Sequence, residues 1–188
     1  MATEHVRDPE GTRAAILQHA ESLVATRGLK VSLADVAKAA GVSKSGLLHH
    51  FASRNALLCA VADHGMRAFI DDVVRDVDPG DREPGARLRA YVRTLCGGSA
   101  RAMALFSPTT LSNGIIAVPG MKPLLEADAD WWRDFFAADG LSVEHVLVVR
   151  HAAEGIAAAS AVEPYLRDTE RRVARDALLA LTHRAISW

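Results

Sequence analysis

The sequence lacks long apolar runs. None of its 188 residues belong to an uninterrupted apolar stretch of the roughly 18 residues that a membrane-spanning helix needs. The first residues, MATEHVRDPEGTR, also lack the apolar centre of a secretion signal. We therefore expect a cytoplasmic protein without a membrane partner.

Cysteine is also scarce. The two cysteines, Cys59 and Cys96, are too few for a disulfide framework or a four-cysteine zinc site, so we expect reduced, buried thiols. Proline and glycine, at 7 and 13 residues, are too few to indicate long disordered segments.

Catalytic motifs are missing as well. The sequence has no Gly-rich phosphate loop, no nucleophile elbow and no metalloprotease helix. His49 and His50 are adjacent, and His151 lies three residues before Glu154, but no third metal ligand follows at a fixed spacing. We expect no metal, no cofactor and no enzymatic activity.

Helical periodicity is present almost throughout, and no segment shows the sustained alternation of a strand, so the predicted fold class is all-α. Capping residues and helix breakers divide the chain into about nine helices. A breaker-rich loop is expected at 76–85 and an irregular or kinked segment at 107–119. The predicted helices cover 9–27, 32–40, 43–50, 53–75, 86–97, 99–107, 121–139, 142–163 and 168 to nearly 188.

The most informative stretch is 32–54, SLADVAKAAGVSKSGLLHHFASR. Ser32 is suited to cap one short helix, Gly41 to end it in a left-handed turn, and Ser43 to cap a second helix. Two short helices joined at a glycine are a candidate helix-turn-helix. Residues 27–54 contain five Lys and Arg against one acid, a balance of +4 in a chain of net charge −1. This asymmetry predicts a basic, phosphate-binding head on a mildly acidic body.

The run GVSKSGLLHHF at 41–51, followed by SRNALL at 53–58, closely resembles the DNA-binding region of the tetracycline-repressor (TetR) family of bacterial regulators. The resemblance covers about the first third of the chain. It implies a homodimeric transcriptional regulator, most often a repressor, with a DNA-binding domain at 1–54 and a ligand-binding and dimerisation domain at 55–188. The long fourth helix would link the two. Further residues at matching positions are Ile16, Ala20, Leu23, Gly28, Val36, Ala37 and Ala40.

The second helix of the motif is expected to enter a groove of double-stranded DNA. Lys44 and Ser45 are candidates for base contact, and Leu47 either touches a thymine methyl group or packs the head. At Leu48 the family commonly has a tyrosine that contacts the DNA backbone, so one phosphate contact is in doubt. For Lys38 a role as an ordinary solvated side chain is an equal alternative. The expected DNA-binding residues are Ser32, Lys38, Ser43, Lys44, Ser45, Gly46, Leu47, His49, His50 and Arg54.

Aromatic residues are concentrated at 131–136, where four rings fall on more than one helix face. At least half of them are expected in an ordinary core. The resemblance implies an apolar pocket for a small-molecule effector of unknown identity, with Arg93, Asn113 and Arg150 as further polar candidates. The expected lining residues are Met103, Phe106, Met121, Trp131, Phe135 and His64.

Small side chains predominate at 152–161, which permits close approach of another helix. The resemblance implies that the last two helices pair with their copies in a four-helix bundle, the alternative being a purely internal core role. Candidate interface residues are Gly155, Ala158, Ala159, Val173, Ala177 and Leu181. Two other functions stay open: a constitutive DNA-binding protein without effector, and a small-molecule-binding protein with a vestigial head.

Overall fold

The computed structural model describes residues 9–98, 115–162 and 165–183. All regular structure in these ranges is helical, with eight α-helices, two short 3-10 turns and no strand. The all-α prediction is therefore confirmed. The predicted helix at 99–107 and the segment 107–114 lie outside the described residues. Within the described ranges, no helix is both long and apolar enough to cross a membrane.

The head consists of α1 (Pro9–Arg27), a 3-10 turn η1 (Gly28–Lys30), α2 (Leu33–Ala39) and α3 (Lys44–His50). Its apolar core draws on all three α-helices, and the next helix adds two residues. Phe51 is buried in this core. The core members are Ile16, Leu17, Ala20, Val31, Val36, Ala37, Leu47, Phe51, Leu57 and Val61.

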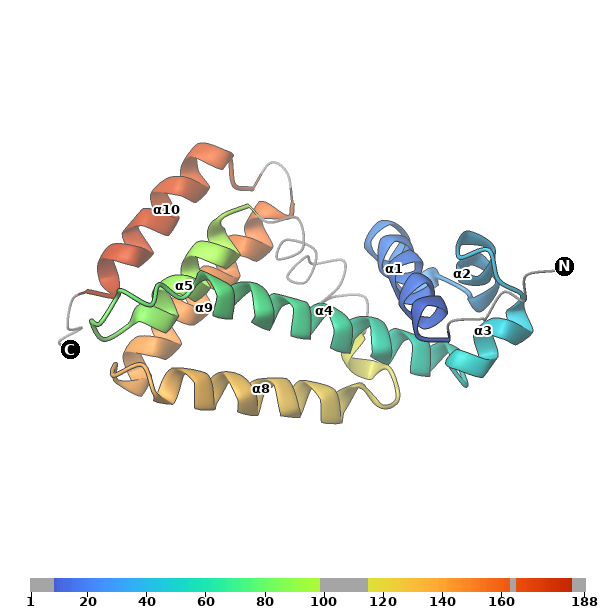
Figure 1. Cartoon of the computed structure of the whole chain (residues 1–188). Coiled ribbons are helices and arrows are strands. Elements are labelled where there is room, and N and C mark those ends of the chain that lie inside the picture. The colour runs from blue at the N-terminus through green and yellow to red at the C-terminus, as the bar shows by residue number, and fades with distance from the viewer. Residues whose placement is uncertain (1–8, 99–114, 163–164, 184–188) are drawn as a thin grey trace, which may run out of the picture.

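The helix α4 (Arg54–Asp76) runs from the head into the body (Figure 1). At about 1.5 Å per residue it is long enough to belong to both. It gives Leu57 and Val61 to the core of the head, and Phe69 and Val73 to the core of the body. The cores of the head and of the body therefore share this helix.

The body is formed by α5 (Ala86–Cys96), the 3-10 turn η2 (Ile115–Ala117), α8 (Met121–Ala137), α9 (Val143–Ser160) and α10 (Asp168–Leu181). Figure 1 shows α8 running beside α4, and α10 at the end of the body far from the head. The α5 helix is central and packs against α4, α8, α9 and α10. Its Tyr91 is 1% exposed and meets the ring of Trp132 edge-on at 5.0 Å between centroids.

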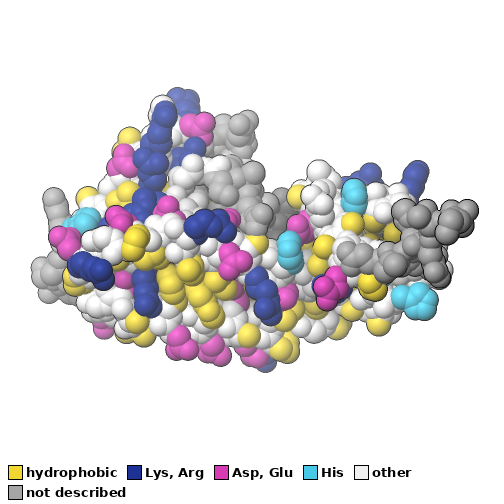
Figure 2. Space-filling model, in the orientation of Figure 1, with side chains coloured by type: hydrophobic (Ala, Val, Ile, Leu, Met, Phe, Trp, Pro, Cys, Tyr) yellow, Lys and Arg dark blue, Asp and Glu magenta, His cyan; other side chains and the backbone are white. Residues whose placement is uncertain are grey.

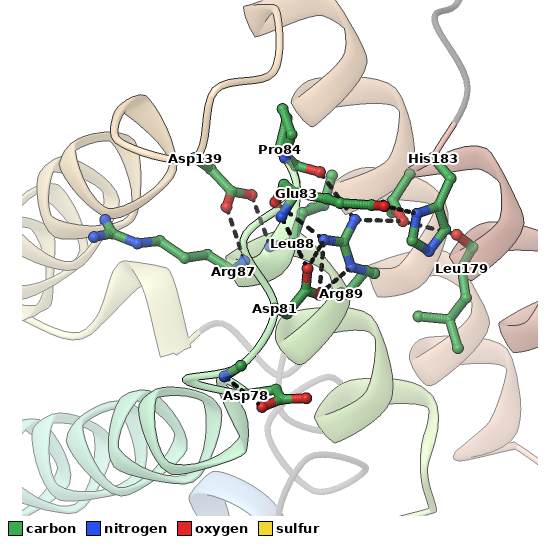
Figure 3. A network of polar contacts seen from close by, with 12 residues as sticks. Asp78, Asp81, Glu83, Pro84, Arg87, Leu88, Arg89, Asp139, Leu179 and His183 are labelled. Atoms are coloured by element: carbon green, nitrogen blue, oxygen red, sulfur yellow. Dashed lines mark hydrogen bonds and ion pairs between the residues drawn. The ribbon is translucent and has the colours of Figure 1, made fainter.

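The predicted end of α8 at Asp139 is wrong, because the helix stops at Ala137 and Asp139 lies in the following turn, from which its side chain reaches the start of α5 (Figure 3). Its carboxylate accepts the backbone N–H groups of Arg87 at 2.8 Å and Leu88 at 2.9 Å. Gly85, the residue before α5, has no side chain to cap the helix. Asp139 therefore caps α5 from about fifty positions further along the chain.

Two later helices also end earlier than predicted. The α9 helix ends at Ser160 rather than near Glu163, and the N–H of the capping residue Ala161 donates to the carbonyl oxygen of Ala157 at 3.2 Å. The α10 helix ends at Leu181 rather than near Trp188. There the hydroxyl of Thr182 donates to the carbonyl oxygen of Leu179 at 2.7 Å.

The loop before α5 is held by Arg89, which is only 3% exposed. Its guanidinium donates to both carboxylate oxygens of Asp81 at 2.7 Å and to the carbonyl oxygens of Pro84 and Glu83 at 2.9 and 3.1 Å (Figure 3). The carboxylate of Glu83 in turn lies 3.0 Å from the ring nitrogen Nδ1 of His183. This network fixes the loop against the end of α10.

Candidate nucleic-acid interface

The first helix of the motif, α2, is capped by Ser32, as predicted, and Asp35 completes the cap with reciprocal hydrogen bonds. Ser32 Oγ accepts the N–H of Asp35 at 3.2 Å, and the Asp35 carboxylate accepts the N–H of Ser32 at 3.1 Å and its hydroxyl at 2.6 Å. These hydrogen bonds from Ser32 hold the pKa of Asp35 below its usual value. Both donors of Ser32 are therefore occupied, and a phosphate would have to displace the carboxylate to reach them.

The turn between α2 and α3 depends on Gly41, whose φ of +66° lies in the left-handed region. A Cβ atom at Gly41 would meet nothing within 4 Å, so the backbone angle rather than crowding favours glycine here. Val42 then donates its N–H to the carbonyl oxygen of Ala37 at 3.0 Å, which closes the end of α2. Ser43 Oγ accepts the N–H of Gly46 at 3.0 Å and caps α3.

One side of α3 faces solvent and the other packs the head. Leu47 is completely buried, so of its two predicted roles the structure supports packing rather than contact with a base. Gly46 and His50 are half-buried beside it. The exposed side carries Lys44, Ser45, Leu48 and His49.

Arg54, predicted to meet a phosphate, is instead engaged inside the head. Its Nε donates to the carbonyl oxygen of Val31 at 2.8 Å, and a terminal nitrogen donates to the carbonyl oxygen of Leu29. The side chain therefore ties the start of α4 to the connection between α1 and α2. No local pattern predicts this role, because the partners are backbone atoms more than twenty positions earlier.

The remaining cations of the head are available. Lys38 and Lys44 are exposed and form no ion pair with any described residue. Arg27 makes one long contact of 3.8 Å with Asp35. Arg13, absent from the predicted interface, is exposed on α1 and lies 5.0 Å from the ring centroid of Phe51, directly after α3. By contrast, acidic side chains gather along the edge of the body over α8 in Figure 2, where Glu126, Asp130 and Asp134 are exposed.

Of the predicted effector residues that the structure describes, only Trp131 and Phe135 lie together. Trp131 and Phe135 stack at 4.9 Å, half-buried against the core of the body, whereas Met121 is fully buried in a separate cluster. His64 is exposed on α4 and bonds to Glu21 of α1 at 2.5 Å. Figure 2 shows apolar side chains at the surface along the seam between α4 and α8. Met103 and Phe106 lie outside the described residues.

A polar cluster lies inside the aromatic core of the body and includes Arg150, one of the polar candidates from the sequence. The Arg150 guanidinium lies 5.8 Å from the ring centroids of Trp132 and Phe136 and donates to Glu154 Oε1 at 2.8 Å. Tyr91, from α5, donates its hydroxyl to the same oxygen at 2.9 Å. Burial alone would raise the pKa of Glu154, but its hydrogen bonds with His151, Tyr91 and Arg150 and the charge of Arg150 lower it.

His151 Nδ1 lies 2.9 Å from the other carboxylate oxygen of Glu154. The two residues considered as metal ligands therefore form a hydrogen bond with each other, three positions apart on α9. Among the described residues, no three His, Cys, Asp or Glu side chains are grouped as metal ligands would be.

The predicted dimer residues lie mainly at the surface. Val173 is 71% exposed and Leu181 37%, while Ala177 and Gly155 are also exposed. Ala158 and Ala159 are half-buried. Nine large apolar side chains of the described chain are exposed, and five of them lie on α9 or α10: Val143, Leu147, Val148, Val173 and Leu181.

Two family models match the chain. The model described as bacterial regulatory proteins, tetR family, matches residues 16–61, which include the head core and the start of α4. The model described as tetracyclin repressor-like, C-terminal domain, matches residues 85–183, just over half of the chain.

Individual proteins agree with these matches. The HTH-type transcriptional repressor KstR2 of Rhodococcus jostii (strain RHA1) is 34% identical over 88 residues, which span 45% of this chain and 41% of that protein. A putative TetR-family regulator from Rhodococcus sp. superposes with a TM-score of 0.71 at 19% identity, covering 92% of this chain and 97% of its own. A putative regulator from Pseudomonas aeruginosa PAO1 gives 0.73 at 15% identity, covering 96% and 95%. At these identities the two structures support the fold alone.

Proposed function

The chain belongs to the tetR family of bacterial regulatory proteins, and we propose that it is a homodimeric repressor released from a palindromic operator by a small apolar effector. Members of the family are DNA-binding transcription factors rather than enzymes. The effector, the palindrome and the dimer belong to the proposal, as do the two domains, 1–54 for DNA and 55–188 for ligand and dimerisation. Its place of action would be the cytoplasm, where bacterial DNA is found.

The exposed face of α3 is the observation that carries the DNA-binding part. Lys44 and Ser45 project from the first turn of a helix whose opposite side is anchored by the buried Leu47. A helix held in this way presents cations and hydrogen-bond donors to base edges and phosphates. Lys38 and His49 would add phosphate contacts, whereas Arg54 would act by holding the head together.

The exposed apolar residues of α9 and α10 support the dimer. Val173, Ala177 and Leu181 recur at four-residue spacing on α10, so they share one face. An apolar face that stays exposed in one subunit is stabilised when it packs against a second copy. Two copies related by a two-fold axis would place their α3 helices in successive major grooves, about 34–36 Å apart.

A buried apolar cluster around Met121, here called the joint, connects the head to the body and supports control by an effector. Met121, at the start of α8, is fully buried with Leu58 of α4 and Val118, and Leu29 and Val24 of the head pack against this cluster. An effector that binds more tightly to one arrangement of the body shifts the population toward it. Through this joint and α4, that shift would change the separation of the two heads.

The experiment is a titration of labelled duplex DNA that carries an inverted repeat from the region flanking the gene. The wild-type protein should bind, and if each dimer neutralises about six phosphates, log affinity should fall with log salt at a slope of about −5. The double variant Lys44→Ala/His49→Ala should lose binding, while Lys122→Ala, an exposed cation on α8, should not change it. A salt-independent affinity, or full binding by the double variant, would refute the proposal.

The two alternatives make different predictions. A constitutive DNA-binding protein would not be stabilised by any small apolar molecule in a thermal-shift screen, whereas an effector raises stability by mass action. A small-molecule-binding protein with a vestigial head would be stabilised by a ligand but would ignore the duplex.

A further inference from the structure

The exposed side of α3 includes one side chain, Leu48, that has no polar group with which to bind a phosphate. Leu48 is 39% exposed, and its isobutyl group has no hydrogen-bond donor. It is the only large apolar side chain on the exposed side of α3, all of which the structure describes. The other exposed members, Lys44, Ser45 and His49, are polar.

Leu48 lies at the centre of that face. Lys44 and Ser45 precede it by four and three residues, so on a helix they are its neighbours one turn earlier. His49 follows directly, and the buried Leu47 lies on the side that packs the head. Any surface that contacts Lys44 and Ser45 together must therefore also contact Leu48.

In the major groove the apolar group on a base edge is the C5-methyl group of thymine. We propose that Leu48 contacts a thymine methyl group in each operator half-site and so helps to select the sequence, an inference that rests on the proposed DNA-binding function. The buried Leu47 is excluded from this contact, because its side chain has no exposed surface. Lys44 and His49, on either side, supply the cationic groups that bring Leu48 against the base pairs.

The test removes the methyl group from the DNA and the side chain from the protein. Each thymine of one operator half-site is replaced in turn by deoxyuridine, which differs from thymidine only by that methyl group. Dissociation constants are measured for the wild-type protein and for Leu48→Ala. For the wild-type protein, replacement at one or two positions should weaken binding about fourfold, the effect of one buried methyl-sized group.

Leu48→Ala should bind the unmodified operator more weakly and should be insensitive to the same replacements. Lys44→Ala, the matched control on the same face, should also bind more weakly but should keep the sensitivity to deoxyuridine. Because Leu48 is at the surface, Leu48→Ala should show an unchanged melting temperature, which excludes a loss of fold.

Three outcomes would overturn the proposal. If no deoxyuridine position weakens wild-type binding, or if Leu48→Ala keeps the wild-type sensitivity, Leu48 does not read a thymine and the DNA-binding function stands. If the wild-type protein binds no duplex at all, the proposed function and this inference fail together.

Discussion

The guanidinium of Arg54 donates a hydrogen bond to the carbonyl oxygen of Val31 at 2.8 Å, which joins the start of α4 to the chain just before α2. A second bond reaches the carbonyl oxygen of Leu29. The head is therefore held to the linking helix by a side chain that satisfies two backbone acceptors at once.

We predict that Arg54→Ala lowers the free energy of unfolding by about 2 kcal/mol, since hydrogen bonds from a charged group to partly buried acceptors are lost. Thermal unfolding followed by circular dichroism measures this. Arg54→Lys keeps the charge but lacks the planar fork, so it should recover only part of the stability. Complete recovery by lysine, or no loss in the alanine variant, would show that Arg54 does not act as this brace.

The ion pair of Asp81 with the buried Arg89 predicts a pH dependence of stability. Hydrogen bonding to Arg89 holds the pKa of Asp81 below its usual value of 3.8, so the folded state favours the carboxylate. The resulting stabilisation is present above pH 4 and is lost as the pH falls through the lowered pKa. Asp81→Asn should therefore be less stable than the wild type at pH 7, by about 2 kcal/mol.

Urea unfolding at pH values from 2.5 to about 7 compares the two proteins. The difference between wild type and Asp81→Asn should begin to shrink below about pH 4, where Asp81 of the unfolded chain takes up a proton. It should disappear once the pH has fallen below the lowered pKa of Asp81 in the folded state, because Arg89 then lacks a charged partner in both proteins. A difference that stays constant down to the lowest pH would contradict the assignment.

The exposed apolar residues of α9 predict the site of self-association. Leu147→Glu should raise the dimer dissociation constant by at least about tenfold, because the interface would then bury an unpaired charge, which costs several kcal/mol. Sedimentation velocity over a range of concentrations measures this. Val74→Glu is the matched control, since Val74 on α4 is 47% exposed and Leu147 46%. Equal effects of the two substitutions would place the interface elsewhere.

The buried joint at Met121 predicts a link between packing and DNA affinity. Met121→Ala should lower stability by about 3 kcal/mol, as for other buried Met-to-Ala changes. It should also weaken operator binding, because Leu58 and Leu29 would lose a packing partner at the junction of body and head. Leu88→Ala is the matched control, equally buried but in the core of the body. It should lower stability without changing operator affinity at temperatures where both variants are folded.

Local chemistry explains what the sequence predicted well. Ser32, Ser43 and Ser53 each cap the helix that follows, and Gly41 takes the left-handed backbone expected of it. Each of these features depends on hydrogen bonds or backbone angles within a few residues, so the residue types alone indicate it. The family resemblance at 41–58 rests on the same short segment.

Contacts between distant segments account for the differences. The role of Arg54 depends on carbonyl groups at Leu29 and Val31, and the end of α8 depends on Asp139 turning toward α5. Neither partner is marked by a local pattern. The separation of Met121 from Trp131 likewise follows from which helices pack together, a property that helical periodicity does not specify.

The cap that Asp139 supplies to α5 also has a consequence for the order in which the protein folds during synthesis. The core of the head is complete once Val61 has left the ribosome, since all its members lie between Ile16 and Val61. By contrast, α5, the central helix of the body, is translated long before Asp139, whose carboxylate caps the first turn of that helix. The nascent chain therefore carries a head with a complete apolar core before the last helices of the body have been made, the sequential pattern general to chains built of more than one unit.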